Sequence, residues 1–189
     1  MEMAIINLKK SILAGICIAI GSLVYLNYQG PIGAILFATG LFSILLLNLN
    51  LYTGKIGYIN SFKELLTMGL IILGNFIGCC IMFAFPYSAT AEMIIGLKMF
   101  SPIYLIFVKS FLCGILIYIA VEGYKKKIYL ITLLSIPTFI LIGAEHSIAN
   151  ICFFIAARYF SFEAFVFFII VIIGNALGSI CIHRWKGIL

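Results

Sequence analysis

Long apolar runs, each near the length that crosses a lipid bilayer, constrain the fold of this chain most strongly. A spanning helix needs about 20 apolar residues. Six such runs occur, at about 11–27, 31–52, 64–86, 101–121, 128–143 and 162–182. Only 10% of the 189 residues are charged and 65% are hydrophobic, whereas a soluble domain carries about 25% charged residues. The sequence therefore predicts an all-α membrane protein with six transmembrane helices.

Basic residues predict the orientation of these helices. With the N-terminus inside, the cytoplasmic segments hold Lys9, Lys10, Lys55, Lys63, Lys125, Lys126, Lys127, Arg184 and Lys186, and the outside segments hold Lys98, Lys109 and Arg158. This distribution follows the positive-inside rule. We therefore expect a multi-pass protein of the inner (plasma) membrane with both termini cytoplasmic. The net charge of +6 then reflects loop placement, and no nucleic-acid partner is expected.

Two of the six runs are interrupted by polar residues. Thr53-Gly54-Lys55 follows the second run and Glu145-His146-Ser147 follows the fifth, each before a short further segment. Irregular backbone at membrane depth is tolerated only where it faces protein or a cavity, and ionisable groups there usually mark a path or a site. Both segments are therefore predicted to be broken helices that carry functional residues.

One motif occurs in both halves of the chain. Gly74-Asn75-Phe76-Ile77-Gly78 recurs 100 positions later as Gly174-Asn175-Ala176-Leu177-Gly178, each time in the helix that follows a broken one. Because three spans per half reverse the direction of the second copy, this predicts inverted repeats over about 5–90 and 98–189 in a single transmembrane domain, 1–189. Close helix packing alone would also explain the glycines.

Other classes of function find little support in the sequence. The six cysteines lie in apolar segments without a C-x-x-C spacing, which indicates packing and not a metal site. An intramembrane enzyme would need a nucleophile with a base, or metal ligands. The chain has no H-E-x-x-H motif, no aspartate and no second midplane histidine. The sequence therefore predicts neither an enzyme nor a cofactor.

Several motifs resemble those of the formate–nitrite transporter family. Glu145 through Asn150 (EHSIAN) is similar to the family's Glu-His-Ser-Val-Ala-Asn motif, and Leu49 through Gly54 (LNLYTG) resembles its Glu-Leu-Phe-Thr-Gly-Asn motif. The segment from Leu13 to Gly21 and the two Gly-Asn-x-x-Gly copies resemble its first, third and sixth helices. This resemblance implies an aquaporin-like 3+3 inverted repeat and a homopentamer with one pore per protomer. The implied substrates are small monovalent anions such as formate, nitrite or hydrosulfide.

The resemblance also implies a pore site, in which His146 and Thr53 face each other. Lys98 would be the outer-side lysine, with Lys109 as its rival. Because a bare anion in a low-dielectric channel costs on the order of tens of kcal/mol, we expect His146 to stabilise or protonate it. An aquaporin-like channel for another small solute, such as a neutral weak acid, is the alternative.

Further residues complete the predicted pore and its support. The candidates for apolar rings that exclude hydrated ions are Phe37, Leu41, Phe42 and Phe139. Tyr118 replaces an asparagine of the family pattern, and either narrows the pore or faces a neighbouring helix. The residues expected to support the broken helices are Asn50, Glu145, Asn150, Asn75 and Asn175. Asn50 and Lys55 also depart from the family pattern, which has glutamate and asparagine there.

Overall fold

Helices make up nearly all of the chain that is described. The computed structural model describes residues 2–83 and 87–186. Its elements are α1 (Glu2–Asn27), α2 (Gly30–Leu46), α3 (Tyr52–Lys55), the 3-10 helix η1 (Ile56–Tyr58), α4 (Phe62–Phe83), α5 (Ala89–Met99), α6 (Ile103–Lys125), α7 (Tyr129–Leu141), α8 (Ser147–Ala156) and α9 (Phe162–Lys186). No strand occurs within these ranges, so the all-α prediction is confirmed. The predicted span end at 84–86 and the domain ends at 1 and 187–189 lie outside the described residues.

Four of the described helices are long and apolar enough to cross a membrane. They are α4, α6, α9 and the part of α1 from Asn7 to Asn27. The other two predicted spans correspond to α2 and α7, which have 17 and 13 residues. Each of these shorter helices is followed by an irregular segment and then by a still shorter helix, α3 or α8. The two expected interruptions are therefore present.

The predicted second run, 31–52, extends too far, because α2 ends at Leu46. Asn48 adopts a left-handed conformation (φ 50°), and the Leu49 N–H donates back to the Ile44 carbonyl at 2.9 Å. The same C-terminal geometry ends α7, where Gly143 has φ 67°. A left-handed residue of this kind stops a helix because its backbone turns away while the last carbonyls are still paired.

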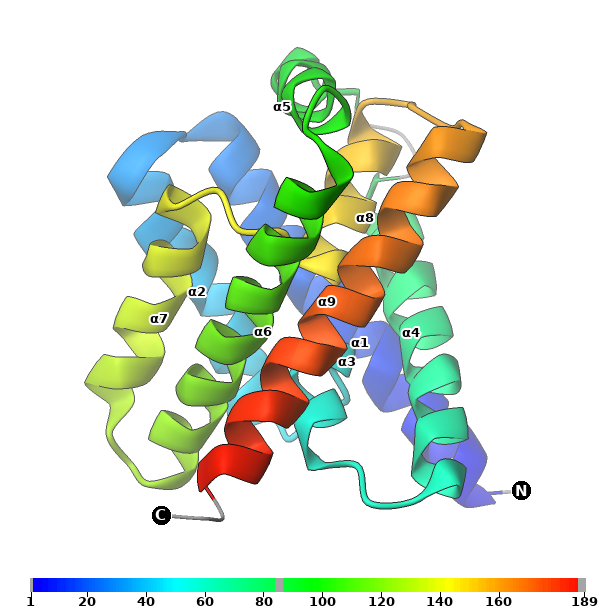
Figure 1. Cartoon of the computed structure of the whole chain (residues 1–189), viewed down its shortest axis with the longest axis vertical. Coiled ribbons are helices and arrows are strands. Elements are labelled where there is room, and N and C mark those ends of the chain that lie inside the picture. The colour runs from blue at the N-terminus through cyan, green and yellow to red at the C-terminus, as the bar shows by residue number, and fades with distance from the viewer. Residues whose placement is uncertain (1, 84–86, 187–189) are drawn as a thin grey trace.

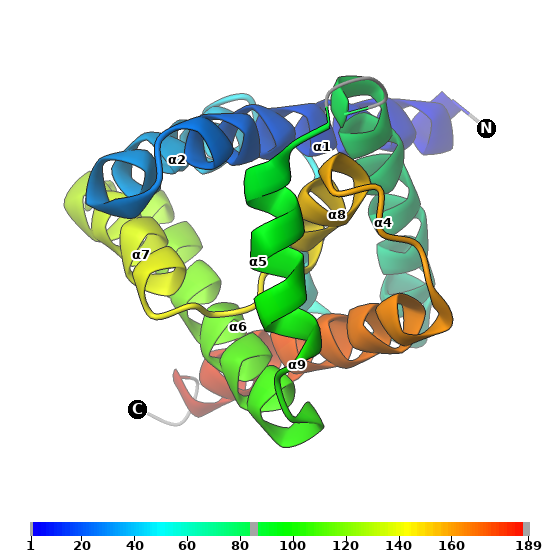
Figure 2. The same cartoon turned by 90° about the horizontal axis from the view of Figure 1, so that it is seen from above.

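A ring of helices surrounds α8. Seen from above, α1, α2, α7, α6, α9 and α4 form the ring, while α5 lies across its upper end (Figure 2). The beginning of α1 and the end of α9 both lie at the opposite, lower end, on different sides of the molecule (Figures 1 and 2). Lys63 lies at the beginning of α4, and Arg184 and Lys186 lie at the end of α9, all at this lower end. Lys125, Lys126 and Lys127 lie at the turn from α6 to α7, also at the lower end, whereas Lys98 belongs to α5.

Two helix pairs, α1 with α4 and α6 with α9, pack at very short range. A Cβ added to Gly78 would lie 2.1 Å from the Ile12 carbonyl oxygen, and one added to Gly178 would lie 2.0 Å from the Phe111 carbonyl oxygen. Small residues allow this approach, which is how helices associate where lipid surrounds them. The repeated Gly-Asn-x-x-Gly motif thus sets the spacing of both pairs.

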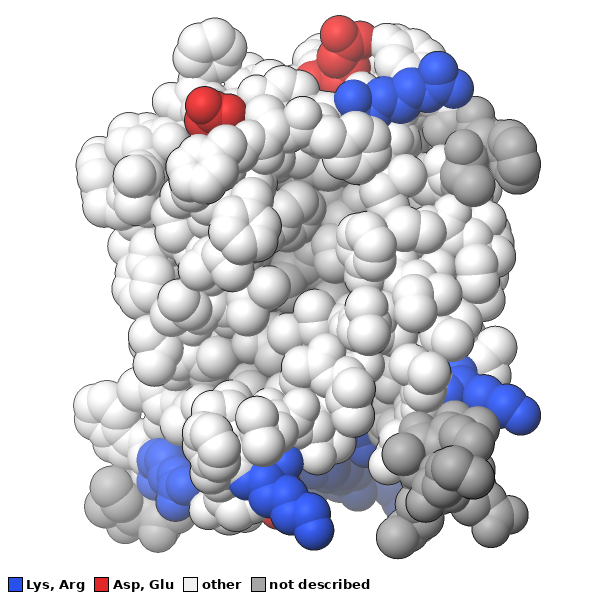
Figure 3. Space-filling model, turned by 90° about the vertical axis from the view of Figure 1, so that its right-hand side faces the viewer, with Lys and Arg blue, Asp and Glu red and all other residues white. Residues whose placement is uncertain are grey.

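The outer surface suits a bilayer. Leu70, Leu73 and Phe76 of α4 are about half exposed. On the face shown in Figure 3, charged side chains gather at the two ends and leave a charge-free belt between them. Such a belt would be unfavourable in water and is favourable in hydrocarbon.

Helix α5 was not expected from the sequence. It begins after Ser88, whose hydroxyl accepts the Ala91 N–H at 3.2 Å, and it carries Glu92 in its first turn and Lys98 in its last. An N-cap serine with these flanking charges is a recognised helix signal. Because α5 has only 11 residues, it is shorter than the apolar runs of about 20 residues that indicate a spanning helix.

Candidate functional site: a histidine between two cavities

His146 is the last residue before α8 and acts as its N-cap. Its Nδ1 accepts the backbone N–H of Ala149 at 3.1 Å. A ring nitrogen that accepts an N–H bond carries no proton itself, so the proton of the neutral ring lies on Nε2. The cap therefore fixes both the orientation of the imidazole and the nitrogen with which it meets other groups.

The Nε2 atom of His146 meets Thr53. The Thr53 Oγ1 lies 3.0 Å from Nε2, and with the proton on Nε2 the ring donates this hydrogen bond. Thr53 belongs to α3 and is 1% exposed, and His146 is 2% exposed. The structure thus brings the two candidate residues together, each at the beginning of a short helix that follows a break.

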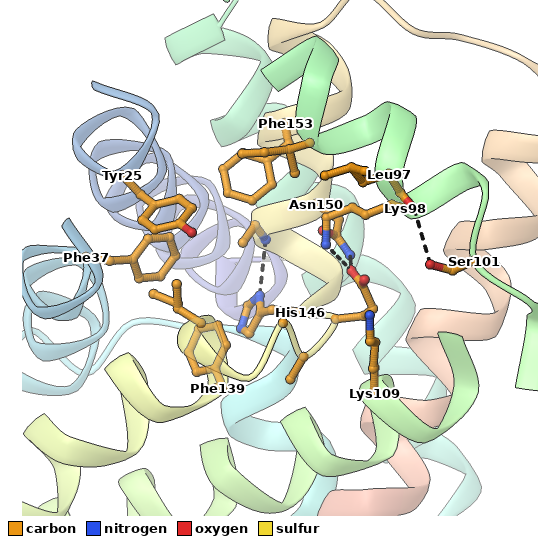
Figure 4. Close-up of a pocket in the computed structure, with 16 residues that line it drawn as sticks. Tyr25, Phe37, Leu97, Lys98, Ser101, Lys109, Phe139, His146, Asn150 and Phe153 are labelled. Carbon is orange, nitrogen blue, oxygen red and sulfur yellow. Dashed lines mark hydrogen bonds and ion pairs between the residues drawn. The ribbon is translucent and has the colours of Figure 1, made fainter. Parts of the chain in front are cut away.

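A cavity of about 200 Å³ lies above this contact, on the side of α5. We call it the upper cavity. Figure 4 shows the rings of Phe37, Phe139 and His146 on one side of it and Lys98 with Asn150 on another. Phe139 stacks on His146, with ring centroids 5.6 Å apart. The histidine therefore presents a desolvated edge to a cavity that also contains cationic groups.

A second, larger cavity of about 640 Å³ lies at the lower end. We call it the lower cavity. Its lining includes Leu41, Leu51 and Gly54. Thr53 lies between Leu51 and Gly54 in the chain, behind this wall, and its own side chain lines neither cavity. Lys55, Lys125 and Lys127 also line it. The two cavities therefore approach the His146–Thr53 contact from opposite sides.

The barrier between the cavities is thin and largely apolar. Phe37 lines the upper cavity and Leu41 the lower. These two residues are one turn apart on α2, which corresponds to about 6 Å along the helix. The edge of Phe37 also contacts Phe139, with centroids 6.0 Å apart. An apolar barrier of this thickness excludes a hydrated ion more strongly than a neutral molecule.

Asn75 and Asn175 hold the two breaks by the same set of bonds. Asn75 donates to the carbonyls of Ser11 and Asn50, both at 2.8 Å, and accepts the Tyr52 N–H at 3.0 Å. In the other half, Asn175 also makes three bonds. It donates to the carbonyls of Ser110 and Glu145, both at 2.8 Å, and accepts the Ser147 N–H at 2.9 Å. Each amide thus satisfies backbone groups that a break leaves unpaired.

Glu145 and Asn50 occupy matching positions but have different partners. The Glu145 carboxylate is 2% exposed, pairs with Lys98 of α5 and accepts the Asn150 amide at 2.9 Å. Asn50 instead donates to the backbone carbonyl and the side-chain oxygen of Asn7, both at 3.3 Å. The second break is therefore held by a buried ion pair, and the first by neutral hydrogen bonds.

Two predicted pore residues, Phe42 and Tyr118, line neither cavity, although each packs against a residue that lines the lower one. Phe42 packs edge-on against Tyr124 on the other side of α2. Tyr118 is buried against Tyr58, with centroids 5.3 Å apart, and its hydroxyl lies 3.0 Å from His183 Nδ1. Tyr118 therefore contacts neighbouring elements, η1 and α9, and a role in narrowing the pore stays a prediction. The helical periodicity of the sequence could not show that Phe37, and not Phe42, lines a cavity, because the face that α2 turns to the cavities depends on packing against its neighbours.

Other lining residues were not among the predicted site residues. Tyr25 and Phe153 line the upper cavity, and Leu51 lines the lower one. Leu51 precedes α3 as His146 precedes α8, so its place in the repeated break was the signal that could have identified it. Lys109, the rival of Lys98, lines the same cavity as Lys98. Within the described ranges, no group of three or more His, Cys, Asp or Glu side chains could hold a metal ion.

The chain was compared with known proteins. The family described as formate/nitrite transporter matches residues 5–184. A solved structure of a pentameric formate channel with formate bound superposes with a TM-score of 0.84 at 17% sequence identity, covering 99% of this chain and 97% of that one. An ion channel of the FNT family superposes with a TM-score of 0.81 at 18% identity, covering 97% of this chain and 89% of that one. The comparison with curated proteins gave no match.

These matches confirm the family resemblance noted from the motifs, and both solved structures share the fold of this chain. The family consists of membrane transport proteins and not of enzymes, in agreement with the prediction from the sequence. Because the family match extends over nearly the whole length, the chain belongs to the formate/nitrite transporter family.

Proposed function

We propose that this protein conducts small monovalent anions, such as formate, nitrite or hydrosulfide, through a pore in each protomer, past His146 and Thr53. The observation that carries the proposal is the buried His146–Thr53 contact between two cavities that approach it from opposite sides. The family match and the formate bound in a protein of the same fold support this class of substrate.

In this mechanism the anion enters one cavity and exchanges its water for the Nε2–H of His146. The bare charge would cost on the order of tens of kcal/mol at the apolar barrier. A hydrogen bond from Nε2–H offsets part of that cost, and a proton that the anion takes from the water of the cavity removes most of it, while the ring stays neutral. Nδ1 is engaged by Ala149, so Nε2 is the atom that reaches the anion. Thr53 then offers its hydroxyl at the same level.

The proposed architecture has six spans in two inverted halves, about 5–90 and 98–189, within one domain. The matched bonds of Asn75 and Asn175 support it, as do the left-handed residues at matching places before each break. Basic residues gather at the end where α1 begins and α9 ends, which supports cytoplasmic termini in an inner (plasma) membrane. The structural relative that is pentameric supports a homopentamer.

Uptake of formate, nitrite and hydrosulfide into proteoliposomes across a pH step tests the proposal. His146→Asn is the informative variant because asparagine is also a favourable N-cap, so α8 keeps its beginning while the ring is lost. We expect the flux to fall about 100-fold, the lower end of the range for a lost proton-transfer group. His183→Asn is the matched control, since His183 contacts Tyr118 and lines neither cavity.

Two results would contradict the proposal in different ways. A wild-type protein that moves none of the three anions would remove the transport function. A wild-type protein that conducts, together with an unchanged flux in His146→Asn, would remove the role of the histidine alone. The mass of the detergent-solubilised particle checks the pentamer separately.

A further inference from the structure

The lower cavity contains an ammonium group without a compensating carboxylate. Lys55 is the last residue of α3, lines this cavity and is half-buried. Within the described part of the chain, its side chain makes no hydrogen bond or ion pair, and no acidic residue lines the lower cavity. The other charged residues that line the cavity, Lys125 and Lys127, are both positive.

The carboxylate next to the wall of the lower cavity, that of Glu122, already has partners. Glu122 accepts the Tyr58 hydroxyl at 2.7 Å, pairs with Lys186 and lies 3.5 Å from Lys125. Lys125 is also placed over the Tyr58 ring, 3.4 Å from its centroid. The charge of Lys125 is thus largely compensated on the wall of the cavity, whereas the charge of Lys55 is not. Lys127 also lacks an acidic partner among the described residues, but its side chain is exposed, whereas that of Lys55 is half-buried.

The internal repeat shows why this charge is unusual. Lys55 stands five residues after Asn50, as Asn150 stands five residues after Glu145. At the second break, Asn150 donates to Glu145, and Lys98 neutralises that carboxylate from α5. At the first break the carboxylate is replaced by an amide and the amide by an ammonium. The first break therefore lacks the carboxylate acceptor of Glu145, although Lys55 carries a positive charge at the position of the Asn150 amide.

We propose that Lys55 forms an anion-holding site in the lower cavity, where a small monovalent carboxylate or a similar anion waits next to the barrier. The site rests on the proposed transport function and adds to it a side-specific step. The cavity of about 640 Å³ is large enough for the anion to keep part of its water. Lys55 therefore acts as a partly screened charge, comparable to an exposed ion pair.

Lys55→Gln in vesicles of defined protein orientation tests the site. With formate supplied on the side of the lower cavity at low ionic strength, we expect the half-saturating concentration to rise about two- to fivefold. Supply from the side of the upper cavity should leave it unchanged. In about 1 M salt the difference should shrink, because the screening length falls to about 3 Å. Lys126→Gln is the matched control, since Lys126 is exposed and does not line the cavity.

Binding is measured separately from transport, by the line width of ¹³C-formate with detergent-solubilised protein. Broadening that is lost in Lys55→Gln and retained in Lys126→Gln supports the site. Conducting wild-type protein with identical half-saturation and identical line widths in Lys55→Gln overturns the site and leaves the proposed function standing. A wild type that moves no small anion overturns the proposed function itself.

Discussion

At the first break, Asn50 and Leu51 stand where the second break has Glu145 and His146. The backbone around them is held alike, by Asn75 in one half and Asn175 in the other. The side chains at the barrier differ, because one half presents an apolar residue and the other an imidazole. The comparison teaches that the bonds to the backbone are common to both halves, whereas the groups that would meet a solute have diverged.

The largest effect is expected from a variant that breaks the ion pair between Lys98 and Glu145 at the second break. Lys98→Met leaves the Glu145 carboxylate buried without its ammonium, so the free energy of unfolding should fall by about 3 kcal/mol. Thermal unfolding in detergent measures it. The double variant Lys98→Met/Glu145→Gln should recover most of the loss, since the amide oxygen can still accept from Asn150. Equal stabilities of the single and the double variant would contradict this account.

The next effect tests the shared scaffold. Asn75→Ala and Asn175→Ala each remove three buried hydrogen bonds to backbone groups, which should cost about 2 kcal/mol in either half. Chemical denaturation of the two variants side by side is the measurement. If only one of the two variants lost stability, the equivalent hydrogen bonds of Asn75 and Asn175 would not contribute equally to the free energy of unfolding.

A smaller effect concerns the spacing of the helix pairs. Gly78→Ala and Gly178→Ala place a Cβ about 2 Å from a facing carbonyl oxygen, so the helices must separate slightly. We expect a loss of about 1–2 kcal/mol in each case, as for other overpacked sites. Gly69→Ala is the control, because nothing lies within 4 Å of its added Cβ. Similar melting temperatures for all three variants would argue against close packing.

The smallest effect is expected at the first break. Asn50→Ala removes two long hydrogen bonds to Asn7, both at 3.3 Å and only partly buried, and should cost about 0.5 kcal/mol. The same unfolding measurement applies. A loss as large as that of Lys98→Met would mean that the two breaks are held with equal strength, which would erase the contrast between them.

The sequence predicted the long helices and both breaks because these depend on local composition. Hydrophobic length identifies α4 or α9 without knowledge of their neighbours. It could not place the end of α2, because that end depends on the left-handed turn at Asn48. It also could not select Phe37 over Phe42, since the face of α2 that meets the barrier is set by packing against α1 and α7.

His146 and Thr53 were predicted as partners from their motifs, and the structure brings them together. The pairing of Glu145 with Lys98 was not predicted, because Lys98 is contributed by α5, a helix that the hydropathy pattern does not reveal. A contact between residues 47 positions apart depends on how that helix lies across the upper end (Figure 2).

The imidazole of His146 makes a hydrogen bond to Ala149 of α8 through Nδ1 and to Thr53 of α3 through Nε2. The ring is thus a hydrogen-bonded link between α3 and α8, in addition to the direct packing of these two short helices. Any group that displaces Thr53 from Nε2 breaks the hydrogen bond between α3 and the residue that caps α8. In the proposed function, a solute that takes the place of Thr53 at Nε2 therefore also removes this link between α3 and α8.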